Sequence, residues 1–185
     1  FLTRTNSSLI ARMIHLNNTH TPYGLVRSPK EIFKTPLMLC SLKYQGFISD
    51  PAYKYIQADV DDWYETELLQ SEFKTPLSYI ASLYSNDDNL VRAIRLIQKY
   101  GSALIFSTYE DARLHSKKDQ SYTLATAHSC KGLEFDEVTI ADDLNEMLSK
   151  VPPTTQLTGL QREAANLYYT ACTRAAKELY NAVYL

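Results

Sequence analysis

The stretch that decides the fold reads Thr126-Ala127-His128-Ser129-Cys130-Lys131-Gly132-Leu133-Glu134-Phe135-Asp136. It lies between two runs typical of strands, Tyr122-Thr123-Leu124-Ala125 and Val138-Thr139-Ile140-Ala141. A strand, a polar loop with one glycine and a second strand are how an α/β fold builds a ligand site at the edge of its sheet. The loop combines hydroxyl, imidazole, ammonium and carboxylate groups. This mixture suits a phosphate-bearing ligand on one side and a nucleotide sugar on the other.

Three stretches of the chain are similar to one known family. The first resembles motif V of superfamily 1 helicases of the UvrD/Rep type, which reads Thr-x-His-x-x-Lys-Gly-Leu-Glu-Phe. The run from Glu163 to Lys177 resembles motif VI, because it keeps the pattern Leu-x-Tyr…Thr-Arg-Ala. Its opening departs from the family, since residues 164–166 read Ala-Ala-Asn where Glu-Arg-Arg is usual. Near the start of the chain, Arg4 and Asn6 match a strand that reads Leu-x-Arg-Thr-Asn in the family's second RecA-like domain.

The resemblance implies roles for the matching residues. Arg174 would be the catalytic arginine, because a guanidinium fork matches phosphate oxygens and phosphoryl transfer depends on neutralising the γ-phosphate. Glu134 would accept hydrogen bonds from the nucleotide ribose, and Gly132 and Arg4 would also contact the nucleotide. The backbone of a single strand would be met by Thr126, His128, Ser129 and Lys131.

Other interpretations of the same residues stay open. The loop hydroxyls and imidazole could cap the loop's own amides. Lys131 could face water instead of phosphate. Arg4 could be a solvated strand end, and Arg174 an ordinary arginine on the surface of a helix. A metal site is not predicted, because the acidic cluster of residues 59–67 has the spacing of a solvated helix face and His128 has no cysteine or histidine at ligand spacing.

The order of the predicted elements indicates an α/β fold. Four β-like runs, at the start and near residues 122, 138 and 180, are separated by helical patterns, which favours a mostly parallel RecA-like sheet flanked by helices. We expect residues 1–24 and 120–185 to form a discontinuous motor domain and residues 25–119 a small helical insertion. The helical block could also be a half of the main domain. The last helix is predicted from about Leu160 to Leu179, with a strand over residues 179–185.

Composition limits the class of protein. The 185 residues are 45% apolar and 22% charged, as in globular proteins, and the net charge of −2 gives no general attraction to nucleic acid. Three cysteines at unrelated spacings form neither a disulfide framework nor a zinc site, so we expect an intracellular, cytoplasmic or nuclear protein. No apolar run is long enough for a membrane span. The start at Phe1 is interpreted as that of a fragment.

The resemblance predicts the second motor domain of an ATP-dependent helicase or translocase that acts on a single strand of nucleic acid. DNA is the favoured strand, and RNA is the alternative. The sequence has no Gly-x-x-x-x-Gly-Lys-Ser/Thr loop and no Walker B pair. An N-terminal RecA-like domain is therefore the expected partner, holding most of the ATP and its Mg²⁺, and this chain alone should not hydrolyse ATP. The alternative is a non-catalytic nucleic-acid-binding or scaffolding module with the same fold, which the departures at residues 164–166 favour.

Overall fold

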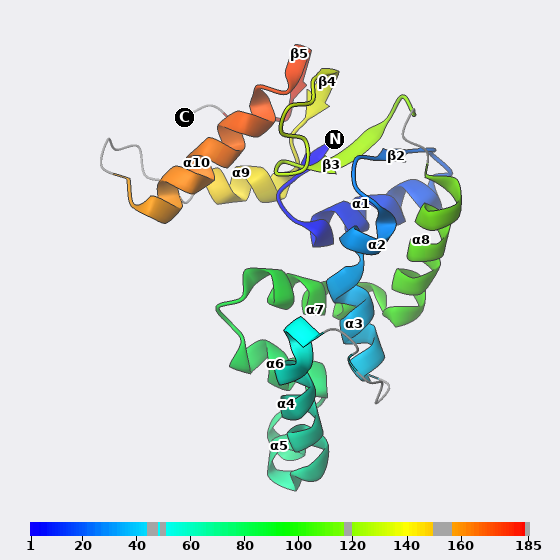
Figure 1. Ribbon diagram of the computed structural model, residues 1–185, viewed down its shortest axis with the longest axis vertical. Coiled ribbons are helices and arrows are strands. Elements are labelled where there is room, and N and C mark those ends of the chain that lie inside the picture. The colour runs from blue at the N-terminus through cyan, green and yellow to red at the C-terminus, as the bar shows by residue number, and fades with distance from the viewer. Residues whose placement is uncertain (44–47, 49–50, 117–119, 150–156, 184–185) are drawn as a thin grey trace. The chain divides into compact units, whose positions relative to one another are not determined.

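A computed structural model describes residues 1–43, 48, 51–116, 120–149 and 157–183 (Figure 1). The chain divides into two compact units. The first combines Phe1–Pro29 with Asp111–Leu185, and the second is Lys30–Glu110. The assignment of one unit as a motor domain and the other as an insertion remains a prediction.

The first unit is built on parallel strands. Strand β1 (Leu2–Thr3) pairs with β3 (Thr123–Thr126), which also pairs with β2 (Gly24–Leu25). Strand β4 (Phe135–Thr139) pairs with β5 (Ala175–Tyr180). A parallel bridge between Leu2 and Ile140 joins the two sets. The predicted α/β class with a parallel sheet flanked by helices is confirmed.

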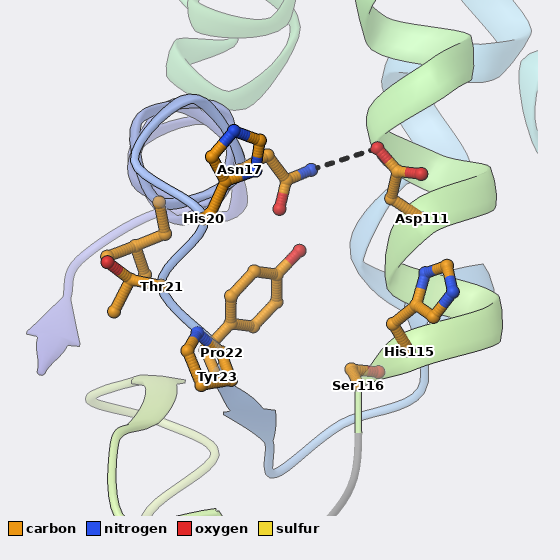
Figure 2. A pocket seen from close by; sticks show the side chains of 9 residues that line it. Asn17, His20, Thr21, Pro22, Tyr23, Asp111, His115 and Ser116 are labelled. Carbon is orange, nitrogen blue, oxygen red and sulfur yellow. Dashed lines mark hydrogen bonds between the residues drawn. The ribbon is translucent and has the colours of Figure 1, made fainter.

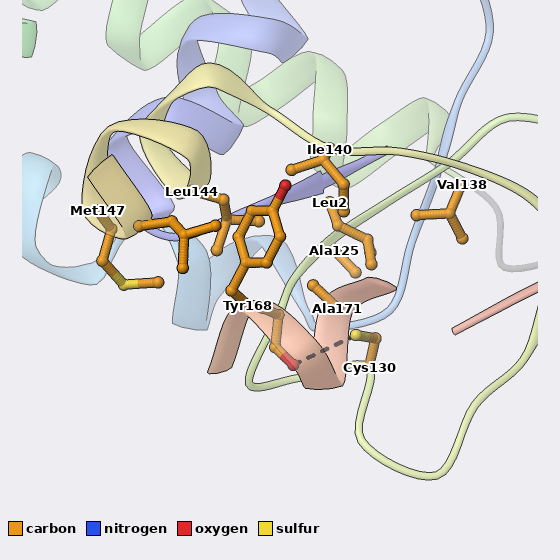
Figure 3. Close-up of a cluster of buried hydrophobic side chains, with 11 residues drawn as sticks. Leu2, Ala125, Cys130, Val138, Ile140, Leu144, Met147, Tyr168 and Ala171 are labelled. Carbon is orange, nitrogen blue, oxygen red and sulfur yellow. Dashed lines mark hydrogen bonds between the residues drawn. The ribbon is translucent and has the colours of Figure 1, made fainter. Parts of the chain in front are cut away.

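Helices α9 (Asp142–Ser149) and α10 (Gly159–Cys172) cover an apolar core beside the sheet. Helix α1 (Asn6–Asn18) packs against β1 and β3. Figure 3 shows Tyr168 of α10 among Leu2, Leu144 and Met147, with Cys130 of the polar loop close by. Burial of these side chains is the main force that holds the helices on the strands. The sheet and the polar loop therefore share one core.

The second unit consists of helices in the described residues. They are α2 (Pro29–Ile32), α3 (Lys34–Lys43), the 3₁₀ helix η1 (Pro51–Tyr53), α4 (Lys54–Glu65), α5 (Glu67–Glu72), α6 (Pro76–Leu83) and α7 (Asp88–Tyr100), followed by α8 (Ser102–His115), which continues into the first unit. Thr75 caps α6 with a capping box, and Gly101 ends α7 at φ 78°, as their sequence predicts. Helix α3 packs on α7, and α4 packs on α6.

The expected bounds of the last helix and the last strand are wrong. The last helix does not run to Leu179: it ends at Cys172, and residues from Ala175 onward form β5 because their backbone pairs with β4. Helix α1 is capped by Thr5, whose side chain accepts the amide of Ser8. Residues 184–185 of the predicted last strand lie outside the described residues.

Candidate functional site

The polar loop leaves β3 beside β1 and folds back on itself. The amide of Ala127 donates to the carbonyl of Thr3 at 2.8 Å, which continues the pairing of the two strands by one residue. The amide of Thr126 donates to the hydroxyl of Ser129 at 3.1 Å, and the Ser129 hydroxyl donates to the Thr126 carbonyl at 2.9 Å. Cys130 is buried and its thiol donates to the Ala127 carbonyl. Burial raises the pKa of the Cys130 thiol, so it behaves as a packing group.

This geometry separates the four residues expected to meet a single strand. Thr126 is buried and bonded to Ser129, which is the arrangement of a loop that caps its own amides. His128 and Lys131 are exposed. The hydroxyls of Thr126 and Ser129 thus bond within the loop, whereas the imidazole of His128 and the ammonium of Lys131 are exposed.

The second half of the loop is open to solvent. Residues 131–134 are all exposed, including the carboxylate residue Glu134. Gly132 has φ 85°, a left-handed conformation that residues with a Cβ rarely adopt. The glycine turns the chain from the buried first half toward β4 and leaves Glu134 at the amino end of that strand.

Arg174 lies beside this half of the loop. It sits in the turn between α10 and β5, and not inside the last helix as predicted, because pairing of the following residues with β4 ends the helix earlier. Its Nη1 donates to the carbonyl of Leu133 at 3.0 Å, and its Nε donates to the carbonyl of Thr170 at 3.1 Å. Its own carbonyl accepts the amide of Phe135 at 2.9 Å. The stretches that resemble motifs V and VI therefore meet in space.

Residues 50–184, more than half of the chain, match the UvrD-like helicase C-terminal domain family. The chain belongs to this family. No solved structure matches the chain at a significant level. The resemblance read from the stretches like motifs V and VI is confirmed at the level of the family, because both lie within the match. Residues 1–49, with Arg4 and Asn6, lie outside it. The match also extends over much of the helical unit.

The UvrD-like domain places its expected nucleotide residues at two positions of the sheet. Glu134, Gly132 and Arg174 lie at the amino ends of β4 and β5. Arg4 follows the carboxyl end of β1. Parallel strands have their amino ends at one edge of the sheet and their carboxyl ends at the other. Arg4 therefore lies at the opposite edge from Glu134, Gly132 and Arg174. Any ligand that contacts both groups must extend between them.

Sequence reasoning missed a residue that fixes the position of Arg4. Asp143, the second residue of α9, is buried, and its Oδ1 accepts the amide of Arg4 at 3.0 Å. Its Oδ2 accepts the amide of Thr5 at 3.1 Å. The only hint in the sequence was the pair Asp142-Asp143 directly after a predicted strand. The residue that Asp143 binds, Arg4, lies 139 residues earlier in the chain, so the sequence does not reveal the contact.

The described part of the UvrD-like domain gives two further results. It contains no group of three or more His, Cys, Asp or Glu side chains arranged to hold a metal ion. Its helices are each too short or too polar to cross a membrane.

Proposed function

We propose that this UvrD-like domain is the second motor domain of an ATP-dependent helicase or translocase that moves on single-stranded nucleic acid. We favour DNA over RNA as that nucleic acid. The observation that carries the proposal is the hydrogen bond of 3.0 Å from the Arg174 guanidinium to the carbonyl of Leu133, next to Glu134. It brings the cation of one family motif to the carboxylate-bearing loop of the other.

The residues at this position fit a nucleotide chemically. Glu134 is exposed and offers a carboxylate that can accept hydrogen bonds from ribose hydroxyls. The guanidinium of Arg174 has a planar set of N–H donors that matches the oxygens of a phosphate group. ATP would supply the phosphoryl group, whose transfer is catalysed mainly by positioning and by neutralising charge. The domain would contribute the arginine and a sugar contact, and so only a part of the ATP site.

The rest of the ATP site would come from a first motor domain of RecA-like fold. The sequence carries neither a Gly-x-x-x-x-Gly-Lys-Ser/Thr loop nor an Asp-Glu pair directly after a strand, both of which such a site needs. The described residues also show no cluster that could hold Mg²⁺ by itself. We therefore assign the magnesium ion and most phosphate contacts to that domain, which must close on this one for hydrolysis.

Contacts with the single strand would come from exposed side chains of the loop on either side of Cys130. His128 and Lys131 are exposed there and can donate hydrogen bonds to phosphate oxygens. Such contacts carry no base information, so the domain would bind strands of different sequence about equally. This is the behaviour that a translocating motor needs.

The test is the ATP dependence of hydrolysis by a protein that carries both motor domains. Glu134→Ala should weaken ATP binding by about 1 to 3 kcal/mol, which is the loss expected for a hydrogen bond to a charged group. Glu137→Ala is the matched control, because Glu137 is an exposed glutamate of the neighbouring strand β4. An unchanged KM for ATP in the Glu134 variant would count against the assignment. Oligonucleotide binding without any ATP hydrolysis would support the non-catalytic alternative.

A further inference from the structure

A pocket of about 410 Å³ lies in the first unit and has no part in the proposed function. It is formed where α1 ends, where the following turn leads to β2, and where α8 ends (Figure 2). Its polar lining residues include Asn17, His20, Tyr23, Asp111 and His115. The volume is in the range of sites that take small molecules.

Tyr23 gives the pocket an unused hydrogen-bonding group. The residue is only 6% exposed, and among the described residues its hydroxyl has no hydrogen-bond partner. Figure 2 shows the ring pointing its hydroxyl into the space between Asn17 and α8. Burial, together with the nearby carboxylate of Asp111, raises the pKa of Tyr23 to about 12 against a smaller lowering by the adjacent Asn17 side chain, so the hydroxyl keeps its proton. A buried hydroxyl without a partner is costly, and a ligand in the pocket would remove that cost.

The electrostatics of the pocket favour a cation. Asp111 is exposed and supplies a carboxylate, which accepts a bond of 3.3 Å from the Nδ2 of Asn17 and has further acceptor positions. Because the Nδ2 of Asn17 donates in that bond, its amide oxygen remains as another acceptor among the lining residues. Helices α1 and α8 both reach the pocket with their carboxyl ends, and a helix carries partial negative charge at that end.

We propose that this pocket binds a small guanidinium compound through Asp111, Tyr23 and Asn17. The acceptors come from two helices and a loop, so a ligand must donate in several directions at once. A guanidinium group has a rigid planar set of N–H donors that matches a carboxylate on one side, whereas an ammonium group concentrates three donors at one point. The proposal is independent of ATP hydrolysis and of binding to nucleic acid.

The proposal can be tested on the 185-residue chain by titration with methylguanidinium at pH 8, followed by NMR. Saturable shifts are expected at the pocket residues, with Kd on the order of 1 to 10 mM for a ligand of so few atoms. N-methylurea has a similar shape without the charge and should bind at least about tenfold more weakly. Absence of saturation up to roughly 50 mM, well beyond that affinity range, or equal binding of N-methylurea, would overturn the proposal.

Two variants assign the contacts. Asp111→Asn should weaken binding about tenfold or more, because it removes a charged hydrogen bond. Glu146→Gln removes an exposed carboxylate of α9 outside the pocket lining and should leave binding unchanged. Tyr23→Phe should weaken binding about threefold to tenfold and should not lower the thermal midpoint of the free chain, since the lost hydroxyl has no partner among the described residues. Unchanged binding in Asp111→Asn, or a lower midpoint in Tyr23→Phe, contradicts the assignment.

Discussion

The carboxylate of Asp143 holds the backbone of Thr5 across 138 residues of sequence. Its Oδ2 accepts the amide of Thr5 at 3.1 Å and the hydroxyl of the same residue at 3.3 Å. Its Oδ1 accepts the amide of Arg4 at 3.0 Å. Thr5 is in turn the cap of α1. One buried carboxylate thus joins the start of α9 to the turn between β1 and α1 and sets the direction in which Arg4 leaves the sheet.

Asp143→Ala should lower the free energy of unfolding by about 2 to 4 kcal/mol, because two backbone amides lose a charged acceptor and at least one of them is buried. Asp142→Ala is the natural control, since Asp142 is exposed and accepts a hydrogen bond of 3.1 Å from Asn181. That control should cost less than about 1 kcal/mol. Denaturant unfolding of the two variants measures the difference, and equal losses would show that Asp143 is not the specific link.

Replacement by alanine should change the stability of the fold in opposite directions at Gly132 and at Gly159. A Cβ at either position meets open space, so only the backbone distinguishes them. Gly132 has φ 85°, and alanine there should cost about 1 to 2 kcal/mol of stability because it is held in a left-handed conformation. Gly159 is the first residue of α10, and alanine there should stabilise the fold by about 0.5 kcal/mol through helix propensity. Thermal unfolding of both variants gives the two signs, and a neutral Gly132→Ala would show that the loop relaxes without strain.

Local signals in the sequence predicted much of the fold, and non-local pairing explains what they missed. The Thr75-Pro76 start and the Gly101 stop are fixed by capping chemistry within a few residues, so both are readable. Ala175, Ala176 and Lys177 are good helix formers, yet they enter β5 because β4 offers pairing partners that no local pattern reveals. Strand β2 has only two residues, and it exists only because β3 lies beside it.

The candidate site shows the same division. The sequence predicts a polar loop with one glycine between two strands, and the left-handed φ of Gly132 is a conformation that glycine permits. The bonding of Thr126 to Ser129 was left open as an alternative, because a hydroxyl can serve a ligand or its own loop equally well by sequence. The link from Asp143 to Arg4 could not be inferred, since it depends on the bridge between Leu2 of β1 and Ile140, the residue after β4.

His128 and Lys131 should carry the contact with a single strand, whereas Thr126 should not. Lys131→Ala should weaken binding to all sequences alike and reduce the slope of log affinity against log salt by about 0.7, the value for one phosphate contact on a single strand. His128→Ala should weaken binding with little effect on stability, because the side chain is exposed. Thr126→Val should instead lower stability, because it removes the hydroxyl that bonds Ser129.

Fluorescence anisotropy with labelled oligonucleotides, measured at several salt concentrations, separates these effects. Lys177→Ala is the control for the loss of one positive charge, because Lys177 is an exposed lysine of β5 that pairs with Asp136. It should leave the salt slope nearly unchanged. If the double variant of His128 and Lys131 binds as tightly as the parent at matched salt, the strand does not pass over this loop.

Arg174 provides the strictest test of the proposed motor. A guanidinium that reaches the γ-phosphate stabilises the transition state more than the ground state, so its removal lowers kcat more than nucleotide affinity. In a protein with both motor domains, Arg174→Ala should lower kcat by on the order of 10³-fold, as for arginine fingers in general. Lysine should restore only a part, because it lacks the planar fork that now spans the Leu133 and Thr170 carbonyls.

The structure also defines what must be controlled in the Arg174 experiment. The Arg174 side chain bonds backbone carbonyls on both sides of the site, so alanine could disturb the loop as well as the chemistry. Arg162→Ala, on the exposed side of α10, controls for the loss of an arginine and should hydrolyse ATP like the parent. ATP binding by Arg174→Ala should fall by less than about tenfold if the loop keeps its shape, since the contact with phosphate is then the main loss. A variant that hydrolyses ATP within a few-fold of the parent would remove Arg174 from the catalytic site, and much of the argument for a motor with it.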